Sequence, residues 1–214
     1  MMKRPGWHLG RCLMVAVALS LLLCGCECAV EGPLFQDDFE NPDSGWGADR
    51  RDGFDRGYDE GVYFFALRAS NWLAWASPGK DFDDVSVEVN ARAASGAQDA
   101  HYGVLCRYKD ADNFYYFAVS ADGYYAIFKR DGGDMEMLTA GGGMLSSPHI
   151  KTGKQVNRVL GVCKGDDLSL YVNGQWLATV TDDTHARGDV GLGASSGPSG
   201  GTRIVFDDFV VTAP

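Results

Sequence analysis

The chain is poor in positive charge. Its 214 residues include 19 Lys and Arg against 29 Asp and Glu, a formal net charge of −10 at pH 7. An acidic surface repels phosphate backbones and anionic lipid headgroups. The composition therefore disfavours nucleic-acid binding and electrostatic attachment to membranes, whereas it suits solubility and cation binding.

Common catalytic motifs are also lacking. The four histidines, at positions 8, 101, 149 and 185, show no His-x-x-x-His spacing, and no serine lies in a Gly-x-Ser-x-Gly turn. The glycines at 141–143 join no strand to a helix, so they indicate a loop rather than a phosphate cradle. These absences disfavour the corresponding enzyme classes.

The apolar run near the N-terminus is too short to cross a membrane. Residues 13–24 number twelve, whereas a membrane-spanning helix needs about 20 residues. A basic segment precedes the apolar run and holds Lys3, Arg4 and Arg11 with no acidic residue among them. This order is typical of a cleaved export signal.

The run ends in Leu23-Cys24-Gly25-Cys26, which resembles the lipobox of bacterial lipoproteins. The resemblance implies cleavage before Cys26 and diacylation of its sulfur, and two or more acyl chains anchor a protein stably. We therefore expect a signal peptide at 1–25, a lipidated tether at 26–33 and a domain at 34–214. The domain would lie in the cell envelope, outside the cytoplasm, with the lipid bilayer as a partner through Cys26. An ordinary secretory signal with an incidental cysteine is the alternative.

From Leu34 onward, the chain shows no sustained helical periodicity and no internal repeat. Residues 85–91 alternate apolar and polar with a period of two, as in a half-buried strand. Asn173-Gly174 between two apolar segments is a strong hairpin signal. Many short strands with regular turn signals predict an all-β sandwich or barrel.

Four segments, 102–119, 168–174, 188–192 and 206–211, resemble the concanavalin-A-like jelly rolls. Within this superfamily, the segments resemble the laminin-G-like and 3-keto-disaccharide-hydrolase-like domains of bacterial surface proteins. The resemblance implies an antiparallel two-sheet β-sandwich. Because the superfamily includes lectins, polysaccharide hydrolases and adhesive modules, it leaves the activity open.

Cys106 and Cys163 each lie inside a predicted strand. Outside the cytoplasm a disulfide between them is chemically allowed. It would close a loop of 57 residues, from 106 to 163. The alternative is a pair of buried free thiols that act as small hydrophobic residues; we favour the bridge.

The paired carboxylates of a glucanase are not found in this sequence. Glucanases of this fold carry Glu-x-Asp-x-x-Glu on one strand, and the nearest match here is Glu88-Val-Asn-Ala-Arg92. Asn90 is an amide that cannot act as nucleophile or base, and the third carboxylate is missing. We expect a polar strand face with an intrastrand Glu88–Arg92 pair rather than catalysis.

Sugar sites commonly combine a stacking aromatic ring with Asp, Asn or Arg side chains that bind hydroxyl groups. The aromatic candidates are Trp72, Trp75, Tyr102, Tyr115, Tyr124, Tyr125 and Trp176, with Arg107 and Asn113 as polar partners. The strand at 113–119 is apolar on both faces, so one face could line a ligand surface. Two alternatives stay open: the rings could belong to the core, and 110–113 could be only an Asx turn.

Aspartate pairs open and close the domain at Asp37-Asp38 and Asp207-Asp208. The first and last strands of such jelly rolls are commonly neighbours, and Ca²⁺ prefers clustered carboxylate and carbonyl oxygens. Alternation points the members of each pair to opposite faces, so we expect at most one from each, Asp38 and Asp207, in a structural calcium site. Solvated strand ends are the alternative.

Three hypotheses follow for function. The first is a surface-anchored, non-catalytic binding module, most simply for carbohydrate, that uses aromatic residues on one sheet. The second is a glycoside hydrolase of the 3-keto-disaccharide type. The third is a structural or adhesive envelope protein that binds another protein.

Overall fold

The computed structural model describes residues 1–2, 32–139 and 141–214. The expected cleavage site and Cys26 lie outside the described residues. Gly32–Pro214 forms one compact unit. No helix of the described residues is long and apolar enough to cross a membrane.

The compact unit is built from β-strands, and its described residues form no helix. The strands are β1 (Phe35–Asp37), β2 (Asp49–Arg50), β3 (Phe54–Asp59), β4 (Val62–Leu67), β5 (Leu73–Ala76), β6 (Val85–Ser95), β7 (His101–Asp110), β8 (Asn113–Ser120), β9 (Tyr124–Asp131), β10 (Asp134–Met137), β11 (Leu145–Ser146), β12 (Asn157–Lys164), β13 (Asp167–Val172), β14 (Gln175–Thr181), β15 (Asp189–Ser195) and β16 (Thr202–Thr212).

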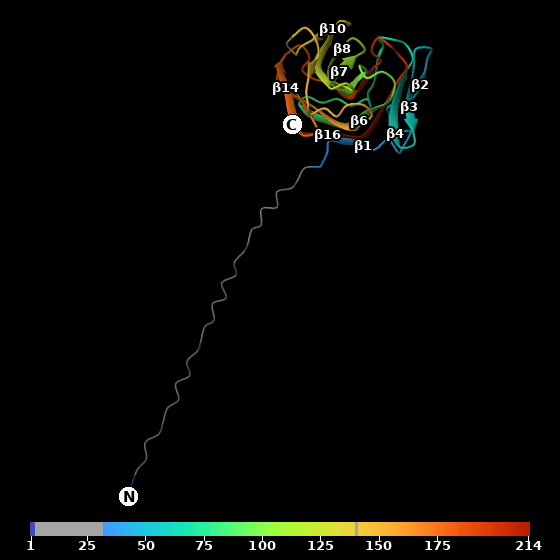
Figure 1. Cartoon of the computed structure of the whole chain (residues 1–214). Coiled ribbons are helices and arrows are strands. Elements are labelled where there is room, and N and C mark those ends of the chain that lie inside the picture. Colours follow the sequence, from blue (N-terminus) through green and yellow to red (C-terminus); the bar gives the residue numbers. More distant parts are fainter. Residues whose placement is uncertain (3–31, 140) are drawn as a thin grey trace. The chain divides into compact units, whose positions relative to one another are not determined.

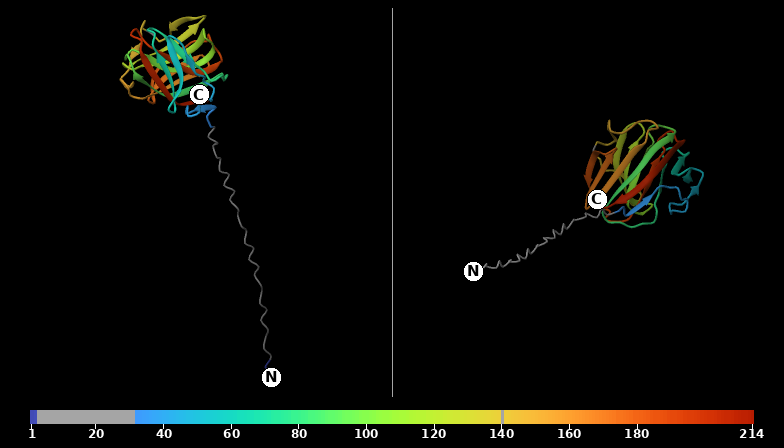
Figure 2. Two further views of the ribbon diagram at one scale, coloured as in Figure 1. Left: turned by 90° about the vertical axis from the view of Figure 1, so that its right-hand side faces the viewer. Right: turned by 90° about the horizontal axis from the view of Figure 1, so that it is seen from below.

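The strands form two antiparallel sheets packed face to face (Figure 1). Sheet A has the order β14-β13-β12-β6-β16-β4-β3-β2, and β1 also pairs with β16. Sheet B has the order β10-β9-β8-β7-β15-β5, and β11 also pairs with β9. Figure 2 shows the two layers from the side and from below. The predicted jelly-roll sandwich is confirmed, including the pairing of its first and last strands.

The local sequence explains why these segments become strands. In β6, Val85, Val87 and Val89 point inward while the residues between them are half-buried. This pattern matches the two-residue period of a strand with one face on the core. Asn173 and Gly174 both take positive φ, 51° and 81°, between β13 and β14, so the predicted hairpin is confirmed.

Sheet B is apolar on both of its faces. In β8, Tyr115, Phe117 and Val119 belong to the core between the sheets. Phe114 and Tyr116 point the other way and form a second apolar cluster on the outer face of sheet B. A Cβ on Gly193 of β15 would lie 2.7 Å from the Tyr116 ring, so the glycine lets this ring lie across the neighbouring strand.

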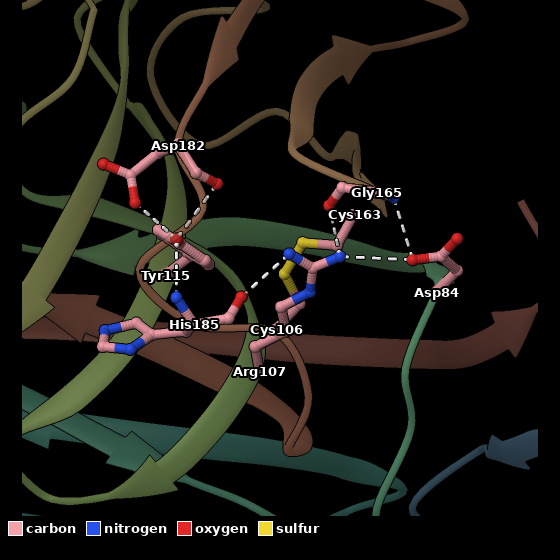
Figure 3. Close-up of a disulfide and its surroundings, with 8 residues drawn as sticks. All are labelled: Asp84, Cys106, Arg107, Tyr115, Cys163, Gly165, Asp182 and His185. Carbon is pink, nitrogen blue, oxygen red and sulfur yellow. Dashed lines mark hydrogen bonds and ion pairs between the residues drawn. A yellow bond between two sulfur atoms is a disulfide. The ribbon is translucent and has the colours of Figure 1, made fainter.

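A disulfide between Cys106 and Cys163 links β7 of sheet B to β12 of sheet A (Figure 3). Their Cα atoms are 6.8 Å apart and both residues are fully buried. The predicted bridge is confirmed, and it ties the two layers of the sandwich together covalently.

Candidate functional site

A hollow opens where the edge of sheet B meets the edge of sheet A. It has a volume of about 330 Å³, at the small end of the roughly 300–1,000 Å³ typical of ligand pockets. β5 forms one wall, and β2 and β3 form the other. Its lining residues are Asp49, Arg51, Phe54, Arg56, Trp72, Leu73, Ala74, Trp75, Ala76, Ser77 and Tyr108. We call this feature the edge hollow.

Two tryptophans line the edge hollow. Trp72 is 43% exposed, and its ring centroid lies 6.1 Å from that of Phe54. Trp75 is half-buried, with its ring 5.4 Å from Phe114. The Trp75 Nε1 donates a hydrogen bond to the Tyr108 hydroxyl at 3.3 Å. The edge hollow therefore offers one exposed ring and one ring held in place by packing and a hydrogen bond.

Backbone geometry sets the direction of both rings. In β5, Ala74 and Ala76 point into the core, so Leu73 and Trp75 face outward by strand alternation. Trp72 lies just before the strand, where its N–H donates to Ser196 Oγ at 3.0 Å and its carbonyl accepts from the Ser196 N–H at 3.0 Å. These two hydrogen bonds hold the Trp72 backbone against Ser196, the residue that follows β15.

Charged side chains on β2 and β3, and in the turn between them, complete the edge hollow. The Arg51 Nη2 lies 2.9 Å from Asp49 Oδ2, and its hydrogen bonding holds the pKa of Asp49 below the usual range. Arg56 donates from Nη1 to the Trp75 carbonyl at 2.7 Å. The Arg56 Nε is buried without a hydrogen-bond partner among the described residues. Aromatic rings and fixed polar donors thus meet in one small concave surface.

The predicted aromatic residues do not all lie on one sheet. Trp72 and Trp75 share the edge hollow. Trp176 is 59% exposed on β14, at the opposite edge of sheet A, and Tyr124 is 41% exposed at the start of β9. Of the predicted aromatic residues, only Trp72 and Trp75 share the edge hollow, and both lie at the β5 edge of sheet B.

Tyr102, Tyr115 and Tyr125 are core residues rather than ligand contacts. All three belong to the cluster between the sheets. The Tyr102 hydroxyl accepts a hydrogen bond from Asn157 Nδ2, and the Tyr125 hydroxyl donates one to the Leu177 carbonyl. The prediction that these three tyrosines bind a ligand is therefore corrected. Side chains alternate between the two faces of a strand, but where both faces are apolar the sequence does not show which face lies outside.

Tyr115 belongs to a buried polar network (Figure 3). Its hydroxyl donates to Asp182 Oδ1 at 2.6 Å and accepts from the His185 N–H at 3.1 Å. Burial raises the pKa of Tyr115 to about 12. Burial alone would raise the pKa of Asp182, but hydrogen bonds from Lys129 and other donors hold it well below its usual range.

Arg107 and Asn113 also have structural roles. Arg107 is 2% exposed and donates to the carbonyls of His185 and Gly165 at 2.8 and 2.7 Å. Its Nη2 lies 3.2 Å from Asp84 (Figure 3). Asn113 donates to Asp110 at 2.7 Å in the turn between β7 and β8. The Asx-turn alternative thus describes Asn113, and neither residue lines the edge hollow.

The calcium prediction is not supported. Asp37 is buried and accepts from Trp46 Nε1 at 2.9 Å, whereas Asp38 is exposed and accepts from the Glu40 N–H. Burial raises the pKa of Asp207, and nearby carboxylates including Asp38 add to this shift. Among the described residues, no three His, Cys, Asp or Glu side chains gather in a group that could hold a metal ion.

The strand that resembles the glucanase motif presents no carboxylate pair. Glu88, Asn90 and Arg92 share the outer face of β6. Glu88 lies 3.5 Å from Arg158 of β12, so the expected intrastrand pair with Arg92 is wrong. Asn90 donates to Asp208 at 2.9 Å. These contacts are those of an ordinary polar sheet surface.

Sequence reasoning missed several residues of the edge hollow. They are Asp49, Arg51, Phe54, Arg56 and Tyr108. The spacing of Phe54 and Arg56 shows that they share a strand face. It does not show that this face turns toward β5, because that contact forms only when the two sheet edges meet.

No protein-family model matches the chain, and no curated protein matches it in sequence. Solved structures similar to it include the carbohydrate-binding module CBM66 from Bacillus subtilis, with 17% identity, a TM-score of 0.54 and coverage of 79% of this chain and 93% of that one. A protein of unknown function with a galectin-like fold from Bacillus subtilis matches with 11% identity and a TM-score of 0.61, over 85% and 96% of the chains.

A β-glucanase from Bacillus licheniformis matches with 11% identity and a TM-score of 0.61, over 86% of this chain and all of that one. Identities this low show a shared fold and do not establish a shared activity. The domain is therefore a concanavalin-A-like jelly roll, the fold that its sequence resembles.

Proposed function

We propose that the domain is a non-catalytic carbohydrate-binding module and that the edge hollow is its binding site. The observation that carries this proposal is the meeting of Trp72 and Trp75 with Arg51, Arg56 and Asp49 in one small concave surface. Aromatic rings can stack on the apolar faces of sugars, while the charged groups bond to hydroxyls. The fold of CBM66, a carbohydrate-binding module, is compatible with this role.

The chemistry of the edge hollow favours binding over hydrolysis. Glycoside hydrolysis commonly needs two carboxyl groups about 5–10 Å apart. Asp49 is the one carboxylate among the lining residues, and Arg51 pairs with it. Asp49 alone cannot supply the two carboxyl groups of this mechanism, so the edge hollow does not offer the pair that glycoside hydrolysis commonly uses.

A glycan array tests the proposal. The full chain would be screened in detergent, and the affinity of each hit would be measured by calorimetry for the wild type, Trp72→Ala and Trp75→Phe. We expect Trp72→Ala to weaken binding about tenfold or more, because exposed aromatic anchors commonly dominate binding energy. Trp75→Phe keeps an aromatic ring packed on Phe114 but loses the hydrogen bond to Tyr108, so we expect a smaller loss.

Trp176→Ala is the matched control, because Trp176 is also exposed but lies at the far edge of sheet A. It should leave the affinity unchanged. If Trp176→Ala abolished binding while Trp72→Ala did not, the site would be elsewhere. Binding to no glycan on the array would contradict the proposed function.

We also propose that the domain is held at the cell envelope by lipid on Cys26, on the strength of the Leu23-Cys24-Gly25-Cys26 motif. Mass spectrometry of the protein purified from a bacterial host would detect the acyl groups and the new N-terminus. Cys26→Ser should lose the acyl mass and move the protein from the membrane to the soluble fraction. An unacylated wild-type chain would contradict this proposal.

A further inference from the structure

The edge hollow has the opposite charge to the rest of the molecule. The chain carries a formal net charge of −10. The charged residues that line the edge hollow are Arg51, Arg56 and Asp49, which give a formal charge of +1. A small basic surface on an acidic protein concentrates anionic ligands locally while repelling large polyanions.

Arg56 is the arginine of the edge hollow that has no ion pair among the described residues, although its charge also helps to lower the pKa of Asp49 on the neighbouring strand. Asp49 is already bound by Arg51, whose Nε and Nη2 lie 3.0 and 2.9 Å from the carboxylate. Among the described residues the Arg56 side chain makes no ion pair, and its one hydrogen bond runs from Nη1 to the Trp75 carbonyl. A guanidinium has five N–H donors, so Arg56 keeps donors that no protein group uses.

A second cation lies beside Trp75. The Arg130 guanidinium carbon is 5.7 Å from the centroid of the Trp75 ring, within the range of a cation–π contact. Arg130 is also 3.4 Å from Asp112, which is 61% exposed. Trp75 therefore contacts two arginines, Arg56 at its backbone carbonyl and Arg130 at its ring.

We infer that the ligand of the edge hollow is an acidic glycan, with a carboxylated sugar such as a uronic acid placed against Arg56. This inference rests on the proposed carbohydrate-binding function and adds the class of sugar. The planar guanidinium fork matches a carboxylate, and charge-assisted hydrogen bonds are roughly twice as strong as neutral ones. The sugar ring would stack on Trp72, while its carboxylate accepts hydrogen bonds from Arg56.

Matched ligands test the inference. Calorimetry on the full chain would compare oligosaccharides of galacturonate, glucuronate and sialic acid with their methyl esters, which keep the sugar ring but lose the charge. Sulfated oligosaccharides would form a third arm. We expect the carboxylated form to bind about tenfold more tightly than its methyl ester, with the difference shrinking at high salt because of screening.

Arg56→Gln should abolish the preference for the carboxylated form, so that the acid and its methyl ester bind this variant with equal affinity. Arg50→Gln is the control, since it removes the same charge from the same region. The Arg50 side chain is 88% exposed and does not line the edge hollow, so this variant should keep the preference. Arg56→Lys keeps the charge but loses the planar fork, so its preference for the carboxylated form should be weaker than that of Arg50→Gln and stronger than that of Arg56→Gln.

The outcomes separate this inference from the proposed function. Equal or tighter binding of the methyl esters, with Trp72→Ala still harmful, would overturn the acidic-ligand inference and leave sugar binding intact. Binding of sulfated but not carboxylated sugars would overturn the carboxylate assignment. Binding of no sugar in any arm would instead refute the proposed function itself.

Discussion

Removal of the disulfide should destabilise the domain by an amount that can be estimated from its position. Cys106 and Cys163 are separated by 57 residues and join β7 to β12 across the core. On the chain-entropy model a loop of this length stabilises by about 4 kcal/mol, since the bridge restricts the unfolded chain. The compact unit spans residues 32–214. With about 2.1 cal/mol/K of unfolding entropy per residue, the expected drop in Tm is about 11 °C.

The measurement compares three samples by urea and thermal unfolding: the oxidised wild type, the wild type refolded under reducing conditions, and the double variant Cys106→Ala/Cys163→Ala. The reduced wild type isolates the crosslink because it keeps both sulfur atoms. The double variant should lose somewhat more unfolding free energy than the reduced wild type, because truncating two fully buried side chains also leaves space in the core.

Peptide mapping of the oxidised protein provides the control, since it must show Cys106 joined to Cys163. A reduced wild type within about 1 kcal/mol of the oxidised form would refute the reasoning. It would mean that the unfolded chain is already compact enough for the crosslink to remove little entropy.

Two further predictions concern buried polar groups. Arg107→Met should lower the free energy of unfolding in urea by about 3 kcal/mol, because it leaves the carbonyls of His185 and Gly165 without their donor. Arg187→Met is the control: it removes an exposed ion pair with Asp81 and should change the free energy of unfolding little. Equal losses of stability in the two variants would contradict the argument. Burial lowers the pKa of His101 to about 4, so the folded protein binds fewer protons than the unfolded chain between about pH 6.5 and 4, and stability should fall as the pH is lowered through this window. His101→Gln should flatten that part of the pH profile, and an unchanged profile would show that His101 is not responsible.

The sequence carried enough information for the fold because the signals that matter are local. The alternation in 85–91 became β6, and Asn173-Gly174 became the turn between β13 and β14. Each of these depends on residues within one strand or one turn. The disulfide was favoured because both cysteines lie in predicted strands of a domain expected outside the cytoplasm, whereas the 6.8 Å between their Cα atoms that allows the bond is set by the assembled sandwich.

The binding residues were harder to predict because burial depends on the whole sandwich. Tyr115 and Tyr116 are neighbours in a strand that is apolar on both faces, and Tyr115 faces the core while Tyr116 faces outward. No local pattern separates them. Trp72 and Trp75 were predicted as two of seven aromatic candidates, and nothing in the sequence showed that these two would share a hollow.

Arg56 shows most clearly why the edge hollow could not be inferred from the sequence. β5 is the last strand of sheet B, so one side of its backbone has no partner strand, and such an edge invites pairing with other chains. Arg56 of sheet A donates to the Trp75 carbonyl of β5. The same guanidinium therefore binds a backbone acceptor of one sheet edge and lines the edge hollow beside the tryptophans. This dual role exists only where the ends of the two sheets meet, which makes the hollow between their edges a product of the assembled fold rather than of any single segment.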